Sequence, residues 1–522
     1  MAKTLLWLLL AVGQLTHHVF GANILCLFGV ASPSHHIWNR SIIDALAAKG
    51  HNVTVISADV EKSPQQNVHY IELEETYPTL YSGAHAISLV EMANENLFSS
   101  IRSFYKDFVI LECEGLLKSK GMDEIKNYPD DFKFDLVLYD MTCGGCLLGL
   151  LHKFKYPPLV SVTPFNNPPY VTDVIGGHKY YAYVPFYSLS YGSDMSFYQR
   201  VHNTLLHVFD YLYRTYSSNP LLDKMVRDYF KYDDLPYVPD LEKRSKLILV
   251  NAHYSIDFPE PAPPNLIPVG GLQIKEPKAL PKDLEEFINA GRKGTVLFSL
   301  GTNVRTEDLG TEKQQMFIDG MRQMPDYNFL WKIDTETTGL KLPKNAIIRK
   351  WLPQNDILAH PKIKGFITHA GLLSTHEATW HGVPMIGIPF IADQHRNLEK
   401  CIRLGVAERI TFQTMTTEQF RETVKHVLES SKYVTNMKRI STLFRDQPEK
   451  PLTRAVWWIE WALRHPAENS LESPVLKLGF LRSNLVDVVL FLALLPVGFF
   501  LVLKNVFCNQ TNSTVSRERK NK

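Results

Sequence analysis

The chain has 522 residues, and 45% of them are apolar, which predicts two to four domains with sizeable cores. Its 56 basic and 54 acidic side chains give a net charge of +2, and no basic patch with interleaved aromatic residues precedes the C-terminal tail. The composition therefore gives no sign of a nucleic-acid-binding protein.

Residues 1–21 have the pattern of a secretory signal peptide. Lys3 precedes an apolar run over residues 5–12, and small residues follow near Gly21, where we expect cleavage. The apolar run is too short for a membrane helix, and His17 and His18 interrupt the stretch behind it. We expect the mature chain to enter the secretory pathway.

The next segment predicts the opening of a βαβ unit, with a strand over residues 23–29, a helix over 41–49 and a second strand over 53–57. Between the first strand and the helix, the loop Ser-Pro-Ser-His-His places His35 at the carboxyl end of a strand. Residues 134–139 predict another strand, and Asp140 follows it directly. Ligands of doubly wound sheets bind at these strand ends.

A histidine and a carboxylate at two such ends can act together. A neutral imidazole is suited to take the proton of a hydroxyl group, and a carboxylate on its other nitrogen fixes the tautomer. On pattern alone, His35 can equally be an ordinary polar loop residue, and Asp140 a helix cap. Both interpretations stay open at this point.

Six cysteines in so long a chain do not predict a disulfide framework. Cys143 and Cys146 form CGGC, but a second pair at metal-ligand spacing is missing, so zinc is disfavoured. Redox chemistry is disfavoured too, because thioredoxin-like surroundings are absent. Cys113 and Cys401 are isolated in the sequence.

The segment from residue 165 to 240 has weak periodicity and many aromatic side chains. They serve either as structural packing or as an apolar wall for a lipophilic ligand. They are Tyr170, Tyr180, Tyr181, Tyr183, Phe186, Tyr187, Tyr191, Phe197 and Tyr198.

A proline-rich stretch over residues 258–271 predicts a stiff interdomain linker after a last strand at 247–251. A second sheet is expected to begin near Ile267 and to continue through residues 295–300. There Ser299, Gly301 and Thr302 form another corner between a strand and a turn.

Residues 351–397 carry the most informative pattern. Two apolar runs, 365–368 and 385–388, predict buried strands, and a helix between them is stopped by Gly382 and Pro384. The polar residues of this unit fall at the strand end, in the turn and in the first helical turn; they are His369, Gly371, Ser374 and Thr375. Free backbone N–H groups and the helix dipole make that corner an anion site, and a diphosphate is its natural occupant.

Further residues give this site the shape of a nucleotide. The indole of Trp351 can stack on a base, and Glu377 can accept hydrogen bonds from the two hydroxyls of a ribose. Asp393 and Gln394 follow the next strand at its carboxyl end, where a polyol would bind.

Near the C-terminus, residues 453–464 predict a helix with three tryptophans, and residues 485–503 predict a transmembrane helix with Asp487 as its one charge. Basic residues follow the apolar run and favour a cytosolic tail. The tail ends ERKNK, which resembles a dibasic retrieval signal of the endoplasmic reticulum. Sequons at Asn39 and Asn52 are candidate glycan sites on the lumenal side.

The run WxPQ, then HxGxxSTxE, a proline and DQxxN resembles the donor-binding signature of the UDP-glycosyltransferases, and "LLSTHEA" and "HGVP" resemble its insect branch. One position departs from the signature: Leu373 stands where plant members commonly have Asn, so a polar contact there must come from Ser374 or the backbone.

The resemblance implies an α/β fold of GT-B architecture, in which two Rossmann-like domains face each other across a cleft. It implies an inverting transferase for hydroxyl groups of small lipophilic acceptors, in detoxification or in hormone or pigment conjugation. His35 would be the general base and Asp140 its supporting acid; Ser34-His35 and Gly50-His51 keep the family's arrangement. The corner of Ser299, Gly301 and Thr302 would face the phosphates.

The same resemblance assigns the donor contacts. His369 and Gly371 would hold the diphosphate, Trp351 and Gln354 the uracil, Glu377 the ribose, and Asp393 with Gln394 the sugar. The insect-like wording favours UDP-glucose over UDP-glucuronic acid. Helix dipoles and His369 would replace a metal, so neither a metal nor another cofactor is expected.

The expected partners are a UDP-sugar, a lipophilic acceptor and a membrane, but no nucleic acid; self-association stays open. The expected location is the membrane of the endoplasmic reticulum, with a single span and a lumenal catalytic part. The expected segments are the signal peptide (1–21), acceptor domain (22–257), linker (258–271), donor domain (272–450), helices packing back on the first domain (451–484), transmembrane helix (485–503) and tail (504–522).

Two rival classes have to be weighed. A nicotinamide-dependent oxidoreductase should show GxGxxG after its first strand, whereas this chain shows GVASPSHH. A lipophile-binding protein without catalytic activity would keep the aromatic segment without needing the His35 and Asp140 pair.

Overall fold

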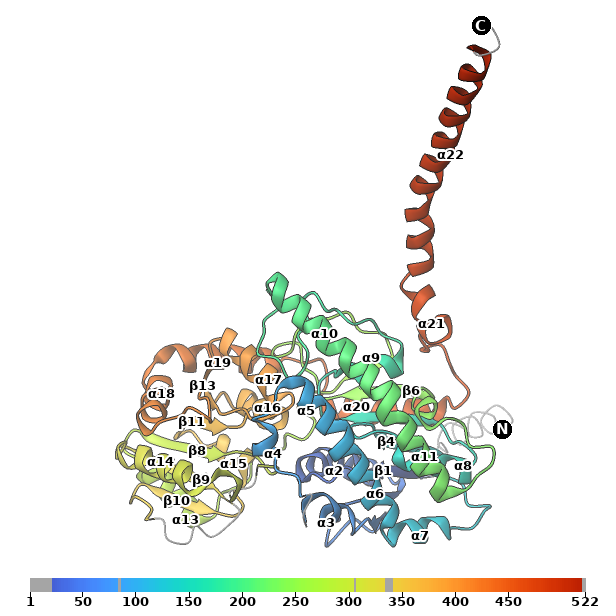
Figure 1. Ribbon diagram of the computed structural model, residues 1–522. Helices are drawn as coiled ribbons and strands as arrows, with labels where there is room; N and C mark the ends of the chain where they lie inside the picture. Colours follow the sequence, from blue (N-terminus) through green and yellow to red (C-terminus); the bar gives the residue numbers. More distant parts are fainter. Residues whose placement is uncertain (1–20, 83–85, 305–306, 334–340, 519–522) are drawn as a thin grey trace, which may run out of the picture. The chain divides into compact units, whose positions relative to one another are not determined.

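The computed structural model describes residues 21–82, 86–304, 307–333 and 341–518. Residues 1–20 of the predicted signal peptide and the last four residues of the tail lie outside this range. The chain divides into two compact units, residues 1–471 and 472–522. The first unit contains two parallel sheets, each with its own helices (Figure 1).

The first sheet has seven parallel strands in the order β3-β2-β1-β4-β5-β6-β7, and we call it and its helices the N-lobe. Its central strands are buried along almost their whole length, as expected for a sheet covered on both faces. Its strands are β1 (Asn23–Phe28), β2 (Asn52–Ser57), β3 (Val68–Glu72), β4 (Leu136–Asp140), β5 (Leu159–Thr163), β6 (Ser245–Val250) and β7 (Leu266–Pro268). The strand order reverses between β1 and β4, and this is where such sheets bind ligands.

Helix α2 (Pro33–Ala48) begins eight residues before the predicted start at Ser41. Pro33 occupies its first turn, where the fixed φ of proline favours helix entry. Trp38, Ile42 and Leu46 then follow at a spacing of four and are fully buried. His35 consequently lies in the first turn of a helix, and the expectation that it lies in a loop was wrong.

Ten further helices complete the N-lobe, and π-helical turns connect α5 with α6 and α10 with α11. The helices are α3 (Thr76–Tyr81), α4 (Leu89–Met92), α5 (Leu97–Ser103), α6 (Ile110–Lys118), α7 (Gly121–Lys126), α8 (Leu150–Lys153), α9 (Pro169–Ile175), α10 (Phe197–Tyr213), α11 (Asn219–Phe230) and α12 (Val238–Glu242).

The second sheet has six parallel strands in the order β10-β9-β8-β11-β12-β13, and with its helices it forms the C-lobe. The strands are β8 (Gly294–Ser299), β9 (Tyr327–Lys332), β10 (Ala346–Arg349), β11 (Ile363–Thr368), β12 (Met385–Gly387) and β13 (Ala407–Arg409). The helices are α13 (Lys282–Ala290), α14 (Thr311–Arg322), α15 (Gln354–Leu358), α16 (Leu372–His381), α17 (Gln394–Arg403), α18 (Thr417–Glu429) and α19 (Ser431–Arg445). Its order reverses between β8 and β11.

The strand predicted to open the second sheet near Ile267 is instead β7, which pairs with β6 at the edge of the first sheet. The side chain of Ile267 packs there in a cluster with Leu247 and Leu249, and this burial holds the strand on the N-lobe. The proline-rich stretch therefore contains a strand of the first sheet.

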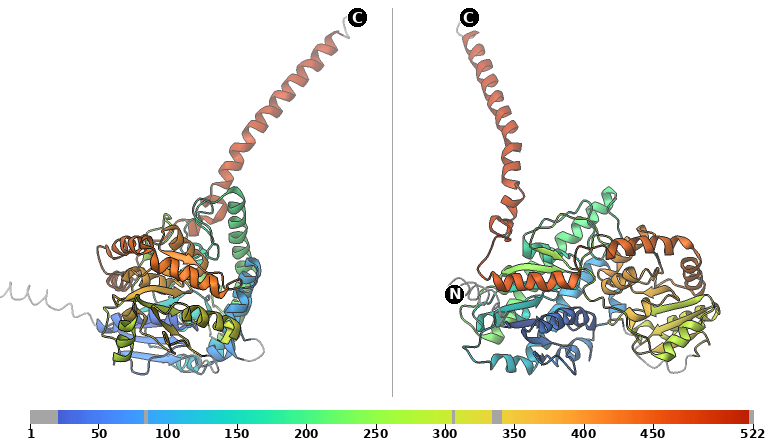
Figure 2. Two further views of the ribbon diagram at one scale, coloured as in Figure 1. Left: turned by 90° about the vertical axis from the view of Figure 1, so that its left-hand side faces the viewer. Right: turned by 180° about the vertical axis from the view of Figure 1, so that it is seen from behind.

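Helix α20 (Pro451–Arg464) follows the C-lobe in sequence but packs on the N-lobe (Figure 2). Its residues Val456 and Ile459 join the cluster of Trp38 and Ile42 from α2. The Nζ of Lys49 lies 2.9 Å from a carboxylate oxygen of Glu460 and adds an ion pair to this contact. The helix thus connects the two lobes.

Cys113 and Cys146 form a disulfide, although the sequence analysis treated Cys113 as isolated. Folding places α6 beside the turn that follows β4, so two residues 33 positions apart come together with their Cα atoms 5.6 Å apart. Cys143 of the CGGC motif is buried as a free thiol.

The second unit contains α21 (Val475–Ser483) and α22 (Val486–Glu518). The segment Val486–Phe507 of α22 has 22 residues with a mean hydropathy of 2.7. Such a helix is about 33 Å long, enough to cross a bilayer. It is the one helix in the described ranges with this length and composition.

Candidate active site

The central pair of the site joins α2 to β4. The Nδ1 atom of His35 lies 3.0 Å from Oδ2 of Asp140, and the two residues are only 7% and 3% exposed. They are 105 residues apart in sequence, but β1 and β4 are neighbours in the sheet. The strand order therefore brings together the two residues that the sequence analysis singled out.

Asp140 has two further partners that no motif indicated. Asn39 donates its amide to Oδ2 at 3.0 Å, and Thr142 donates its backbone N–H and its hydroxyl to Oδ1 at 3.1 and 2.7 Å. Burial raises the pKa of Asp140, but the charge of His35 and these hydrogen bonds outweigh it, so the pKa lies below its usual value. An ionised Asp140 holds the proton of His35 on Nδ1 and leaves Nε2 to accept one.

The contact with Asp140 also corrects one expectation from the sequence. Asn39 is 2% exposed and its amide is used inside the site, so its sequon is not open to a glycan. Asn52, at the start of β2, is exposed.

A second corner lies in the C-lobe, where β8 and β11 end side by side. Ser299 ends β8, Gly301 and Thr302 follow it, and His369 follows β11. A Cβ atom on Gly301 would lie 2.6 Å from Cε1 of His369, and one on Gly371 would lie 2.3 Å from its Nε2. The His369 ring thus packs against two turns, and any side chain larger than that of glycine at positions 301 and 371 would clash with it.

Burial, and to a smaller extent the charge of Lys332, lowers the pKa of His369 to about 4. At neutral pH it is an uncharged imidazole that can donate one hydrogen bond. Its Nδ1 is buried and has no hydrogen-bond partner among the described residues. Ala370, the next residue, has a φ of 62°, a left-handed conformation that is uncommon for alanine and typical of functional turns.

Helix α16 begins at this corner, as predicted. Its first bond runs from the Thr375 N–H to the Gly371 carbonyl at 2.9 Å, so the N–H groups of Leu372, Leu373 and Ser374 precede the regular helix pattern. The hydroxyl of Thr375 donates back to Gly371 at 3.0 Å. The backbone N–H groups at the start of α16 are therefore better placed to bind an anion than the Thr375 hydroxyl, which already donates to Gly371.

Trp351, Gln354 and Glu377 lie next along the C-lobe. Gln354 donates to Glu377 at 2.9 Å and to the hydroxyl of Ser374 at 3.1 Å. Burial raises the pKa of Glu377 to about 7, although the bond from Gln354 opposes this shift. Trp351 is 61% exposed, and Nζ of Lys332 lies 5.1 Å from its ring centre.

Asp393 and Gln394 begin α17. The carbonyl oxygen of the Gln394 side chain accepts two backbone N–H groups, at 2.8 and 3.2 Å, which leaves its amide hydrogens available to a ligand. Burial raises the pKa of Asp393 to about 6, while Asn397 and the charge of His35 lower it.

Two polar contacts join the lobes beside these residues. The hydroxyl oxygen of Ser32, the residue before α2, lies 2.9 Å from the side-chain nitrogen of Asn303 and 3.1 Å from its side-chain oxygen. Arg396 of α17 donates to the Asn166 side chain and, at 3.3 Å, to the Pro185 carbonyl. These contacts place the start of α2, which carries His35, beside the turn that follows β8.

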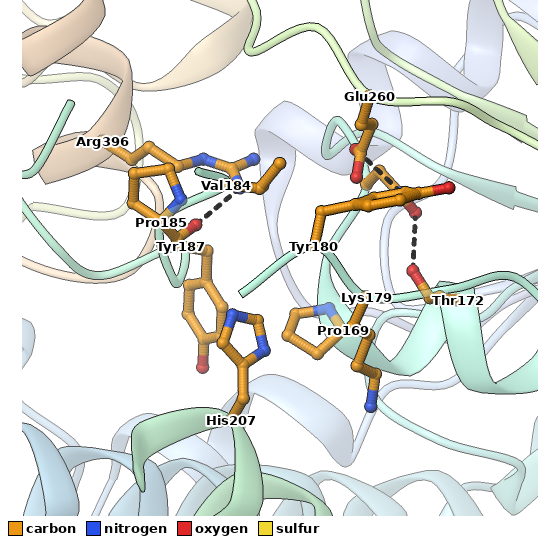
Figure 3. A pocket seen from close by; sticks show the side chains of 11 residues that line it. Pro169, Thr172, Lys179, Tyr180, Val184, Pro185, Tyr187, His207, Glu260 and Arg396 are labelled. Atoms are coloured by element: carbon orange, nitrogen blue, oxygen red, sulfur yellow. Dashed lines mark hydrogen bonds between the residues drawn. The ribbon is translucent and has the colours of Figure 1, made fainter. Parts of the chain in front are cut away.

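A hollow lies beside the second contact (Figure 3). Tyrosines and prolines of residues 169–187 line it together with His207, Glu260 and Arg396. Glu260 accepts a hydrogen bond from Asn167 at 2.9 Å. Asn167, Thr172 and Lys179 line it as well, so the hollow has a mixed lining of aromatic, aliphatic and polar side chains.

Sequence reasoning missed the residues that act through tertiary contacts: Ser32, Asn39, Thr142, Asn303, Lys332 and Arg396. For three of them, the place in the sequence next to a predicted element or motif was the only indication of a role. Lys332 ends a strand, Asn303 follows the glycine turn, and Arg396 stands inside the DQxxN pattern. Nothing in the local sequence pointed to Asn39 or Thr142.

Two doubly wound sheets that meet at their strand ends, with an imidazole on one and an anion corner on the other, define a glycosyltransferase of GT-B architecture. Solved structures agree on the fold. A glycosyltransferase of kitacinnamycin has a TM-score of 0.56 at 17% identity, covering 85% of this chain and 99% of its own. The glycosyltransferase VinC, in complex with DTDP, has a TM-score of 0.57 at 15% identity with the same two coverages.

The sequence profile of the family described as "UDP-glucoronosyl and UDP-glucosyl transferase" matches residues 26–521, and the chain belongs to this family. UDP-glucosyltransferase 2 of Dactylopius coccus is 33% identical over 93% of this chain and 92% of its own. UDP-glucuronosyltransferase 2B15 of Rattus norvegicus is 31% identical over 94% and 93%. The predictions of the family, the GT-B fold and the enzyme class are confirmed.

Proposed function

We propose that this glycosyltransferase moves a sugar, with inversion, from a UDP-sugar to a hydroxyl group of a small lipophilic acceptor. The observation that carries the proposal is the buried His35 and Asp140 pair of the N-lobe, three residues from Ser32, whose hydroxyl contacts Asn303 of the C-lobe.

In the proposed reaction, Nε2 of His35 takes the proton of the acceptor hydroxyl, and the freed oxygen attacks the anomeric carbon. The bond from that carbon to the diphosphate breaks, and UDP leaves with the bonding electrons. Asp140 stabilises the imidazolium that forms. A single displacement of this kind inverts the configuration at the anomeric carbon.

The donor would lie on the C-lobe. His369, Gly371 and the N–H groups at the start of α16 would hold the diphosphate, with the turn of Ser299, Gly301 and Thr302 opposite. The remaining contacts follow the order of the nucleotide sugar: Trp351 and Gln354 for uracil, Glu377 for ribose, Ser374 and Thr375 near the phosphates, and Asp393 with Gln394 for the sugar. This proposal needs no metal, and the absence of one stays a prediction.

The acceptor would lie on the N-lobe. The aromatic side chains considered above have different surroundings: Tyr180 and Tyr187 line the hollow between the lobes, Phe186 is in the core, and Phe197 and Tyr198 are exposed on α10. We therefore assign the apolar acceptor wall to the first pair.

UDP-glucose is the proposed donor. The name of the Dactylopius coccus relative supports this choice, although the mammalian relatives are named as glucuronosyltransferases. We also propose a single-span protein of the endoplasmic reticulum with its catalytic part in the lumen. The apolar segment of α22 and the Cys113–Cys146 disulfide support this location, because disulfides persist in oxidising compartments.

The test compares His35→Ala with His36→Ala in the full chain. Loss of a general base should lower kcat by a factor of about 10² to 10⁴ while the Kd for UDP stays unchanged. His36 is the matched control, because its Nε2 contacts Glu61 at 3.0 Å and not Asp140. Product formation from labelled UDP-glucose and UDP-glucuronic acid is measured against a panel of phenols and steroids. Equal losses in both variants, or no loss in the first, would reject His35 as the base.

A further inference from the structure

His207 on α10 is a buried imidazole that the proposed reaction does not use. It is 7% exposed and packs against the rings of Tyr181 and Phe186, with centroids 4.8 and 5.0 Å away. Neither ring nitrogen has a hydrogen-bond partner within the described part of the chain. Figure 3 shows the ring directed into the hollow between Tyr187 and Pro169.

The protonation state of His207 determines what it can bind. Burial, together with the charges of Lys179 and Arg396, lowers its pKa to about 3, so the ring is neutral at physiological pH. A neutral imidazole donates one hydrogen bond and accepts another. A hydroxyl group can donate to the unprotonated ring nitrogen or accept from the ring N–H, so it can pair with one of the two nitrogens.

The neighbouring charged groups already have partners. Nζ of Lys179 lies 2.6 Å from Asp173, and Glu260 accepts from Asn167. Arg396 bonds Asn166 and Pro185, although its Nε is buried with no partner among the described residues. A buried polar group without a partner is unfavourable, so the ring nitrogens of His207 and Nε of Arg396 favour a ligand that can hydrogen-bond to them.

Size and position fit one end of an acceptor. The space open to a water-sized group is about 20 Å³, enough for a single hydroxyl. Phe165 contacts the His35 ring with centroids 5.5 Å apart, and Pro169 lines the hollow. Phe165 and Pro169 are four residues apart, which is at most about 14 Å of chain, so the segment that contacts the His35 ring also reaches the hollow.

We propose that His207 recognises a second hydroxyl group on the acceptor, at the end remote from the hydroxyl that receives the sugar. This inference rests on the proposed function and names its substrate class: rigid lipophilic molecules with hydroxyls at both ends. A site built to hydrogen-bond a hydroxyl discriminates against the analogue that lacks it, because its polar groups are then left unpaired.

The experiment uses matched pairs of acceptors on biphenyl, stilbene and oestrane skeletons, with one hydroxyl or with two at opposite ends. For the full chain in detergent with saturating UDP, calorimetry gives each acceptor Kd, and turnover with UDP-glucose gives kcat/KM. We expect the wild type to prefer the dihydroxy member of at least one pair by about tenfold or more. His207→Phe should reduce this preference to below about twofold, and His207→Gln, which keeps a donor and an acceptor, should retain most of it.

His202→Phe is the matched control, since His202 lies on the same helix but bonds Tyr191 at 2.9 Å outside the hollow. It should leave the preference unchanged. An unchanged UDP Kd shows that each variant is folded. Equal wild-type affinity for both members of every pair, or an undiminished preference in His207→Phe, overturns the inference. Selective binding without turnover would instead overturn the proposed function and leave the inference standing.

Discussion

The carboxyl groups of this site are all buried, but their partners give them pKa values shifted in opposite directions. Asp140 is surrounded by donors and keeps its pKa below the usual value, whereas burial raises the pKa of Glu377 to about 7 and that of Asp393 to about 6. Shifts of this kind gather where chemistry or binding needs them. Here the ionised Asp140 suits a supporting acid, and Glu377 is poised to change its charge when a ligand binds.

Glu377 predicts a pH-dependent affinity for the donor. The ionised carboxylate accepts from both ribose hydroxyls and is a stronger acceptor than the protonated acid, so the affinity for UDP-glucose should rise as pH rises through about 7, with a proton released on binding below that pH. The stability of the free protein depends on pH in the opposite direction. The raised pKa of Glu377 favours folding at low pH, and this contribution to the free energy of unfolding is lost as pH rises through about 7. Glu377→Gln should weaken binding about tenfold and remove the proton release.

Calorimetry in buffers of different ionisation enthalpy measures the released proton. Glu399→Gln is the control, because Glu399 is a partly exposed residue of α17 paired with Arg403. Proton release that persists in Glu377→Gln would show that another group titrates.

At the scale of elements, the site is built from strand ends that turn sharply. Gly301 has a φ of 83°, and the non-glycine residues Ala370 and Ala392 adopt φ values of 62° and 53° directly beside His369 and Asp393. Such conformations persist only when the surrounding structure fixes them. The turns after β8, β11 and β12 therefore set the direction of the donor-side groups before any ligand arrives.

Gly301→Ala tests this rigid corner. The added Cβ would meet the His369 ring at 2.6 Å, so the imidazole must move, and we expect the UDP Kd to rise about tenfold or more. Gly310→Ala is the matched control: its φ is 73°, and no atom among the described residues lies within 4 Å of the added Cβ. Both variants should lose about 1 kcal/mol or more of stability through the left-handed backbone, as thermal unfolding would show. Equal UDP binding in the two would contradict a role for the glycine contact.

At the scale of the molecule, the lobes meet in the first unit through Ser32 with Asn303 and Arg396 with Asn166, while α20 returns from the C-lobe to the N-lobe. In the proposed reaction, these contacts let His35 on one lobe act on a donor held by the other. The second unit supplies the apolar helix α22, which we propose as the membrane anchor.

The proposed lumenal topology predicts one glycan on the N-lobe, at the exposed Asn52 and not at the buried Asn39. Asn52→Gln should abolish the mobility shift produced by endoglycosidase on protein expressed in insect cells. Asn39→Gln should leave that shift in place and lower kcat, because its amide supports Asp140. A shift that survives Asn52→Gln would contradict the assignment. The tail has two further sequons, at Asn509 and Asn512, which the proposed topology places in the cytosol, and a glycan on either would reverse the topology.

Much of the donor side was predictable because its signals are local. Strands β8 and β11, the turn at Gly371, helix α16 and the residues from Trp351 to Gln394 follow from apolar runs, glycine turns and motif spacing. The start of α2 was wrong by eight residues, because Pro33 and polar side chains hid the spacing of Trp38, Ile42 and Leu46. The domain limits stay predictions.

The sequence by itself determined the family, the two doubly wound sheets and the apolar C-terminal helix. It also identified His35 and Asp140 as candidate site residues. Each of these results depends on a short, local sequence pattern. Only the tertiary structure decided which distant residues meet: Asn39 and Thr142 on Asp140, Ser32 on Asn303, and Cys113 on Cys146. Strand order and the approach of the lobes create these contacts. No local periodicity records them, because their partners lie up to 271 residues apart in the chain.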